Sequence, residues 1–248
     1  MPSESTEKLQ HIYRLQQGKL VSINHMTENL GGIRDRLEAF SAEQGRLAAG
    51  LEGCTNRCRA AIRRLEQKED KGERREKTGS ADPDMLSPAR KKSLLQVMRE
   101  VHDASSLAAE SIHRLSVSHK HSAELLELSV IMVKHFLWRE RLFMTVILGD
   151  RDNSTLKQVS VRSCALGKWY DGRGKRAYSH LPAYRSLGDA HFRYHMAINE
   201  LADKDIKGMS FGELSAALAR LEMLSQQIVG LIGQIQHHVV LLQSLPDD

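Results

Sequence analysis

Apolar residues recur at alternating spacings of three and four over residues 9–65. One position of this heptad pattern holds, in chain order, Leu30, Leu37, Gln44, Leu51, Cys58 and Leu65. The other position holds Ile33, Phe40, Leu47, Cys54 and Ala61. A 3.5-residue period kept for this length is typical of a coiled-coil helix with both positions in its seam. Glycines within this stretch weaken an isolated helix, so we expect it to need packing partners.

The period is lost over residues 66–87, which are charged and contain Gly and Pro, and we predict a linker there. Ser87 and Pro88 then look like an N-cap followed by a first-turn proline. A second heptad pattern follows, richer in small and polar residues, with a seam formed by Leu94, Met98, Val101, Ser105, Ala108, Ile112, Leu115, His119, Ser122, Leu126, Ser129, Val133 and Phe136. The two helices can pair as a hairpin within one chain or across a dimer, and the sequence is compatible with both.

A third helical pattern begins near Ser210. Ser210 and Glu213 have the spacing of a capping box, and aliphatic residues follow at heptad spacing as far as Leu242. No segment alternates at the period of a strand, so the predicted fold class is all-α. We divide the chain into a coiled-coil helix (1–65), a charged linker (66–87), a second coiled-coil helix (88–129), a segment of different character (130–208) and a C-terminal coiled-coil helix (209–248).

Aromatic residues identify that segment of different character. Phe, Trp and Tyr make up 5% of the chain, and most of them lie between Phe136 and Phe211. No apolar run approaches the roughly 20 residues of a membrane-spanning helix, and the polar residues at 1–8 do not resemble a secretory signal. Three cysteines do not make a disulfide framework. We therefore expect a cytoplasmic protein without membrane insertion.

The aromatic segment contains candidate metal ligands. His191 and His195 are four residues apart, which places both imidazoles on one helical face with their Cβ atoms about 5–6 Å apart. Cys164 is the only cysteine of the segment, and His135 lies on the helix that enters it. Zinc in structural sites takes four nitrogen or sulfur ligands. The remaining histidines show no ligand spacing.

These residues resemble a known family. His135, then Cys164 within Cys-x-Leu-Gly-x-Trp-Tyr, then His191-x-x-x-His195 is similar to the chemoreceptor zinc-binding (CZB) domain of bacteria, over residues 130–205. Further similar positions are Trp138, Gly172, Tyr178, Leu181, Pro182 and Phe192. The resemblance implies a small four-helix bundle that binds one Zn²⁺ through the three histidines and the cysteine. The expected architecture is then long coiled-coil helices plus a small four-helix zinc-binding bundle.

The same resemblance implies a sensory role in chemotaxis or cyclic-di-GMP signalling, with zinc or an oxidant such as hypochlorite as the signal. The ligand chemistry agrees, because a zinc-bound cysteine is a thiolate and oxidants attack the thiolate. Oxidation of Cys164 would weaken one of the four metal bonds, and the glycine-containing segment around it is a poor helix that suits local rearrangement. We place five residues around the site or in its core: Trp138, Leu166, Gly167, Trp169 and Phe192.

Two other functions compete with a sensor. A zinc hydrolase needs an open coordination position and a general base, and Phe192 rather than a glutamate follows His191, so we expect no enzymatic activity. A coiled-coil scaffold with a purely structural zinc site stays open as the alternative, because metal binding can stabilise a fold without signalling.

The partners are less defined by the sequence. We find no cyclase signature and no receptor-type hairpin tip, so we expect an unidentified signalling partner, together with a homodimer formed through the coiled-coil helices. The net charge of +5 is spread over helix faces, and we expect no nucleic-acid binding. Cys54 and Cys58 both fall in the predicted seam, where we expect them to pack as small apolar residues rather than form a second metal site or intermolecular disulfides.

Overall fold

The computed structural model describes residues 4–76, 88–148 and 160–244, and these residues form helices and no strand. The predicted all-α fold is confirmed for them. The chain divides into two compact units, one made of residues 1–35 and 121–248 and the other of residues 36–120. No helix among the described residues is both long and apolar enough to cross a membrane.

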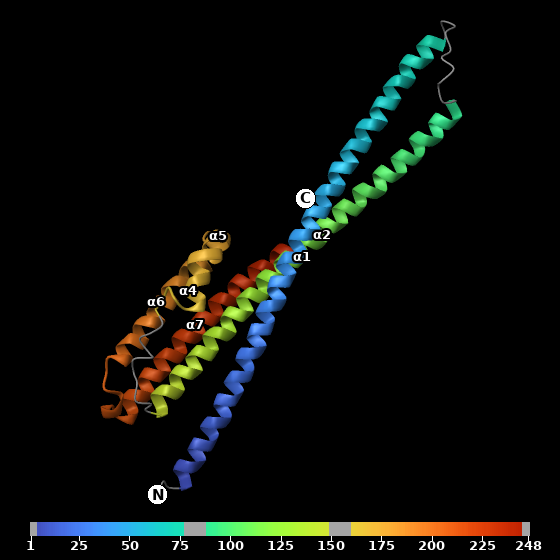
Figure 1. Ribbon diagram of the computed structural model, residues 1–248. Helices are drawn as coiled ribbons and strands as arrows, with labels where there is room; N and C mark the ends of the chain where they lie inside the picture. Colours follow the sequence, from blue (N-terminus) through green and yellow to red (C-terminus); the bar gives the residue numbers. More distant parts are fainter. Residues whose placement is uncertain (1–3, 77–87, 149–159, 245–248) are drawn as a thin grey trace. The chain divides into compact units, whose positions relative to one another are not determined.

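The unit of residues 36–120 is an antiparallel hairpin of helix α1 (Glu4–Glu76) and helix α2 (Pro88–Leu148) (Figure 1). Ser41 and Ser116 join the helices through a reciprocal pair of hydrogen bonds, in which each hydroxyl donates to the other residue's carbonyl oxygen over 2.8 Å. His119 Nδ1 lies 2.8 Å from Gln44 Oε1. The two long helices therefore pair within the chain.

The buried seam of α1 differs from the predicted one by a single residue position. Leu37, Leu51 and Cys58 are half-buried as predicted. At the other predicted position Ala61 is half-buried, but the prediction is wrong for Phe40 and Leu47, which are 50% and 57% exposed, and for Cys54, which is also exposed. The residues one position further along the chain are buried instead, namely Ser41, Ala48, Thr55 and Ile62.

Helix α2 shows the same displacement. Met98 and Ile112 are half-buried as predicted, whereas Leu94, Val101 and Leu115 are 43%, 55% and 51% exposed. The next residues along the chain face the partner helix instead: Leu95, His102, Ala109 and Ser116. Small residues allow the two backbones to approach closely enough for the serine pair to exchange hydrogen bonds, which is the physical reason for the shifted seam.

Helix α1 also continues beyond its predicted end. It reaches Glu76, so residues 66–76 of the predicted linker are helical. Lys, Arg and Glu are good helix formers, and they make up much of this stretch. The rest of the predicted linker, 77–87, lies outside the described residues. The predicted boundary between residues 129 and 130 falls inside the continuous helix α2.

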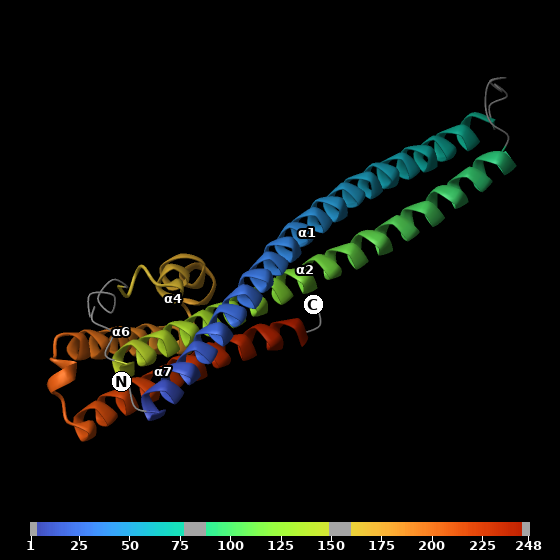
Figure 2. The same cartoon turned by 60° about the horizontal axis from the view of Figure 1, so that its bottom comes forward.

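The unit of residues 1–35 and 121–248 is a helical bundle. Its core is formed by the second half of α2, helix α6 (Pro182–Ala202) and helix α7 (Phe211–Ser244), which lie side by side (Figure 2). The apolar stripe of α7 is almost fully buried, with Leu221, Ile228, Ile232, Ile235 and Val239 at 1% exposure or less. Gln236 Nε2 donates to Ser129 Oγ over 2.9 Å and ties α7 to α2.

Two local predictions in this bundle are confirmed. The capping box at the start of α7 is present, because the Ser210 backbone N–H donates to Glu213 Oε2 and the Glu213 N–H donates to Ser210 Oγ. The segment around Cys164 is a broken helix, made of α4 (Ala165–Trp169), the π-helical turn η1 (Tyr170–Gly174) and α5 (Lys175–Tyr178). A short 3₁₀ turn, η2 (Ile206–Gly208), connects α6 to α7.

Candidate metal centre

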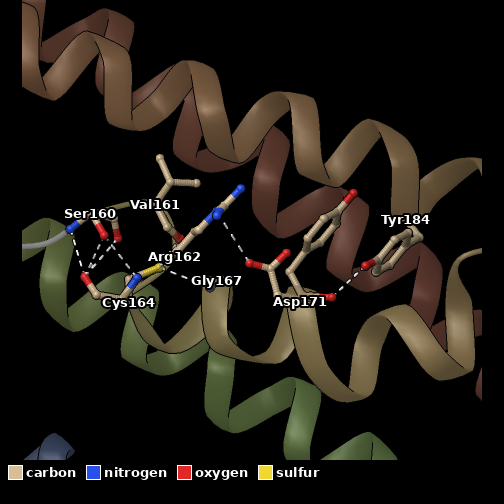
Figure 3. Close-up of polar contacts among 9 residues, drawn as sticks. Ser160, Val161, Arg162, Cys164, Gly167, Asp171 and Tyr184 are labelled. Atoms are coloured by element: carbon tan, nitrogen blue, oxygen red, sulfur yellow. Dashed lines mark hydrogen bonds and ion pairs between the residues drawn. The ribbon is translucent and has the colours of Figure 1, made fainter.

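Cys164 is held in place as the N-cap of α4. Its backbone is extended, with φ −69° and ψ 165°, and its Sγ accepts a hydrogen bond from the Gly167 N–H over 3.2 Å. A turn between Ser160 and Ser163 precedes it, and Figure 3 shows this turn together with the thiol and the first residues of α4. An N-cap side chain is held against the first turn of its helix by the hydrogen bond that it accepts. The Cys164 thiol therefore has a defined position at the start of α4.

Gly167 allows the chain to pass very close to Cys164. A Cβ atom on Gly167 would lie 1.8 Å from the carbonyl oxygen of Val161. That oxygen belongs to the turn before Cys164, and the thiol itself lies 3.6 Å from it. The turn and α4 can fold over one another only because residue 167 has no side chain.

The π-helical turn η1 is fastened to α6 by two tyrosines. The rings of Tyr170 and Tyr184 stack with 4.2 Å between their centroids, and Tyr184 Oη donates to the Tyr170 carbonyl oxygen over 2.6 Å (Figure 3). Gly188 leaves room for this stack, because a Cβ there would lie 2.2 Å from Tyr170 Oη. These contacts fix the segment that carries Cys164 against the helix that carries the histidines.

The structure brings Cys164, His191 and His195 together. His191 Nε2 lies 3.2 Å from Cys164 Sγ and 3.1 Å from His195 Nε2. Both histidines are 3% exposed, and the three donor atoms all lie within 4.8 Å of one another. In tetrahedral zinc sites, two nitrogen ligands are about 3.3 Å apart, and a nitrogen and a sulfur about 3.6 Å. The three donors therefore have nearly the spacing of ligands on one small metal ion.

His135 is not part of this three-residue cluster. Its ring lies nearby, 5.0 Å from the Tyr194 ring between centroids, but its Nε2 lies 2.9 Å from Ser225 Oγ on α7. Nδ1 is the ring nitrogen left free by this contact. The structure therefore brings three of the four predicted ligands into one cluster. That His135 is the fourth ligand stays a prediction. Ser225 was visible in the sequence as a polar residue within the apolar heptads of α7.

Burial sets the protonation of these groups. It lowers the pKa of His191 to about 3, with His195 and His135 adding repulsion, and lowers the pKa of His135 to about 4, with Arg139 and His195 contributing. Burial also raises the pKa of the Cys164 thiol, opposed by the backbone N–H groups of α4. At neutral pH, His135 and His191 therefore keep a lone pair for a metal, whereas the thiol has to lose its proton to bind one.

The surroundings of the cluster match the sequence predictions with one exception. Trp138 stacks on His195 with 5.3 Å between ring centroids, and Leu166 and Trp169 are buried in the same core. Phe192 is the exception, since it is 55% exposed and the prediction that it belongs to the core is wrong. Consecutive residues of a helix point about 100° apart, so the turn that buries His191 carries Phe192 outward.

A cavity of about 330 Å³ leads to the cluster. His135, Cys164, His191 and His195 line it, and so do Lys134 and Arg141 of α2. Helix α1 also contributes to its lining through Asn24 and Glu28, and the Asn24 amide donates to the Glu28 carboxylate over 2.8 Å. A helix far away in sequence therefore contributes to the surroundings of the candidate metal ligands.

Comparison with known families places this centre. Residues 135–202 match the family model of the chemoreceptor zinc-binding (CZB) domain. The match confirms the resemblance seen in the sequence and lies inside the predicted limits of 130–208. The three clustered donors and His135 all belong to the CZB segment, whereas Asn24, Glu28 and Ser225 lie outside it. No curated protein and no solved structure matches the chain.

Tyr194 offers a test of packing in the CZB segment. Its hydroxyl is buried and has no hydrogen-bond partner among the residues that the structure describes. A buried polar group without a partner costs about 1–3 kcal/mol of folding free energy. Tyr194→Phe is therefore expected to raise the melting temperature of the metal-free protein, which circular dichroism measures. Tyr184→Phe is the matched control and should lower it, because the Tyr184 hydroxyl bonds to a carbonyl oxygen. A lower melting temperature for Tyr194→Phe would contradict this account.

Proposed function

We propose that the chain is a zinc-binding sensory or regulatory protein, in which zinc occupancy or the oxidation state of Cys164 changes helix packing and signals to a partner protein. The observation that carries the proposal is the cluster of Cys164, His191 and His195 within a CZB domain. By analogy with that family the metal is zinc. We place the protein in the cytoplasm, and we propose binding and signalling rather than catalysis.

The arrangement of the donors supports coupling between the metal and the helices. Cys164 caps α4, His191 and His195 belong to α6, and His135 of α2 contacts Ser225 of α7. A metal ion held by these residues would tie separate helices together, and its loss would release them. Because Glu28 of α1 lines the same cavity, the change would also reach a helix outside the CZB segment.

Oxidation of Cys164 would act on the bond between its sulfur and the metal. Hypochlorous acid converts a cysteine thiolate into a sulfenic acid and releases chloride, with two electrons passing from sulfur to chlorine. The sulfenic acid is a poorer zinc ligand than the thiolate, so the metal would be held by imidazoles alone. The cap of α4 depends on Cys164 Sγ, and we expect this helix to loosen with it.

Hydrogen–deuterium exchange of the full chain tests the proposal. We expect zinc to slow exchange in α4 and α6, and also in residues 20–30 of α1, relative to chelator-treated protein. Treatment of the zinc form with hypochlorous acid should reverse the protection, and Cys164→Ala should abolish that oxidant response while Cys54→Ala retains it.

Two results would count against a sensor. If zinc protects α4 and α6 but leaves every other helix unchanged, the metal is structural and the chain is a scaffold. If the chain binds no zinc at micromolar concentration, the proposal is wrong altogether.

A further inference from the structure

Ser225 is a buried polar residue in the apolar stripe of α7. The stripe members before and after it are Leu221 and Ile228, which are buried, and Ser225 itself has an exposure of 0%. A hydroxyl that is buried without a hydrogen-bond partner destabilises a fold. The burial of Ser225 therefore depends on a specific polar contact inside the bundle.

The hydroxyl of Ser225 is directed to another helix rather than to its own. Serine and threonine hydroxyls inside a helix often bond to the carbonyl oxygen four residues earlier. Bonds of this kind are made by Ser22, Thr27, Thr55, Ser111, Ser129 and Thr145. Ser225 Oγ instead lies 2.9 Å from His135 Nε2 on α2, and within the described part of the chain this is the one hydrogen bond of its side chain. The hydroxyl therefore stabilises the His135 ring rather than the backbone of α7.

The orientation of the His135 ring is fixed from two sides. The ring is 7% exposed, and the Tyr194 ring packs against it with 5.0 Å between centroids and an angle of 58° between the planes. This packing restricts where the ring lies. A ring turned by 180° about its Cβ–Cγ bond would present a carbon in place of Nε2 to Ser225, so the hydrogen bond selects one of the two orientations.

The contact with Ser225 also determines which nitrogen of His135 is available to a metal ion. A neutral imidazole carries its proton on one nitrogen and a lone pair on the other, and a serine oxygen can accept that proton. Metal-binding histidines commonly donate the N–H of their second nitrogen to an oxygen, which fixes both the tautomer and the direction of the ring. His135 lines the same cavity as the three clustered donors, so its Nδ1 lone pair would be held ready beside them.

We propose that Ser225 is a positioning residue for the fourth metal ligand: its hydroxyl accepts the Nε2–H of His135 and leaves Nδ1 free to bind zinc. The proposal rests on the proposed zinc-binding function and deepens it, because Ser225 lies outside residues 135–202, which match the CZB family. Helix α7 thereby takes part in the metal centre through a residue that is not itself a ligand. A displacement of α7 along α2 alters the fourth ligand, so the zinc affinity depends on how α7 packs.

Competition titration of the full chain with a fluorescent zinc chelator tests the proposal. We expect Ser225→Ala to lower the zinc affinity roughly 10–100-fold, as changes to supporting residues do. Ser225→Thr keeps the hydroxyl and should retain most of the affinity. Ser129→Ala is the matched control, because it removes the hydrogen bond that Gln236 of α7 donates to α2 over 2.9 Å and leaves His135 untouched. It should bind zinc as the wild type does.

A double-mutant cycle separates positioning from general packing. His135→Ala removes the proposed ligand, and Ser225→Ala in that background should lower the zinc affinity no further, because residues that act through one another are not additive. Two-bond ¹H–¹⁵N correlation NMR of the metal-free chain provides a readout without zinc. We expect the Nε2–H tautomer of His135 in the wild type and in Ser225→Thr.

Three results would overturn the role of Ser225: an unchanged zinc affinity in Ser225→Ala, an equal loss of affinity with and without His135, or a His135 protonated on Nδ1 in the metal-free wild type. Each of them leaves the cluster of Cys164, His191 and His195 and the sensory function in place. A wild-type chain that binds no zinc removes the sensory function and the role of Ser225 together. Zinc binding by the wild type therefore distinguishes the two failures.

Discussion

Cys164→Ser is expected to lower the zinc affinity of the chain by at least about 100-fold, since changes to residues that only support a ligand already cost 10–100-fold. Serine keeps the size of the side chain and an acceptor for the Gly167 N–H, so α4 should still form. What it lacks is an anionic sulfur at neutral pH. Competition titration with a fluorescent zinc chelator measures the change directly.

The pH dependence of the affinity separates this effect from misfolding. Burial raises the thiol pKa of Cys164, so zinc has to displace a proton, and wild-type affinity should rise about tenfold per pH unit below that pKa. The pKa values of His191 and His135, about 3 and about 4, keep both imidazoles neutral in this range, so neither has to lose a proton to bind the metal. The rise should be absent in Cys164→Ser and intact in Cys54→Ser. An unchanged affinity in Cys164→Ser would exclude this thiol as a ligand.

Gly167→Ala is expected to disrupt the centre without touching a ligand. The added Cβ would meet the Val161 carbonyl oxygen at 1.8 Å and the Arg162 Cα at 3.0 Å. These are backbone atoms that cannot rotate away, so the turn before Cys164 has to move. Overpacking of this kind costs about 1–3 kcal/mol. We expect a melting temperature lower by several degrees and a zinc affinity lower by roughly 10–100-fold, as for other supporting residues.

Gly172→Ala is the matched control for Gly167→Ala. It lies in the same broken helix, and no atom within 4 Å would meet its Cβ. Replacing a glycine in a helical conformation by alanine stabilises by about 0.4–1 kcal/mol, so this variant should melt no lower than wild type and bind zinc normally. If the two glycine variants behave alike, the close approach at Gly167 has no influence on the metal centre.

Much of the centre could be predicted because its signals are local. The spacing of His191 and His195 fixes their common face through helix geometry alone, and Cys164 stands in a compact motif with Gly167. The same helix geometry argues against a core position for Phe192. The buried face of α6 contains Leu187, His191, Tyr194 and Ile198, and Phe192 is turned away from it. In α6, helical period is therefore a better guide to burial than aromatic character.

The contacts made over long sequence separations could not be predicted in this way. The contact of His135 with Ser225 joins residues 90 positions apart, and Glu28 reaches the cavity from a helix with no recognised ligand. The seam of the hairpin shows a different limit. The heptad period identifies a coiled-coil helix, but α1 and α2 each carry two neighbouring heptad stripes. The serine pair and the small residues beside it determine which stripe of each helix faces the other helix.

We expect helix α1 also to affect the rate at which the Cys164 thiol reacts with added reagents. The cavity that leads to the thiol has Asn24 and Glu28 in one wall and Lys134 and Arg141 in another. A reagent inside this cavity lies among a carboxylate, two cations and the thiol, so we expect anionic and cationic thiol reagents of equal size to differ in their second-order rate constants. The alkylation rate of a single cysteine thereby reports the local electrostatic potential beside α1, without any measurement of metal.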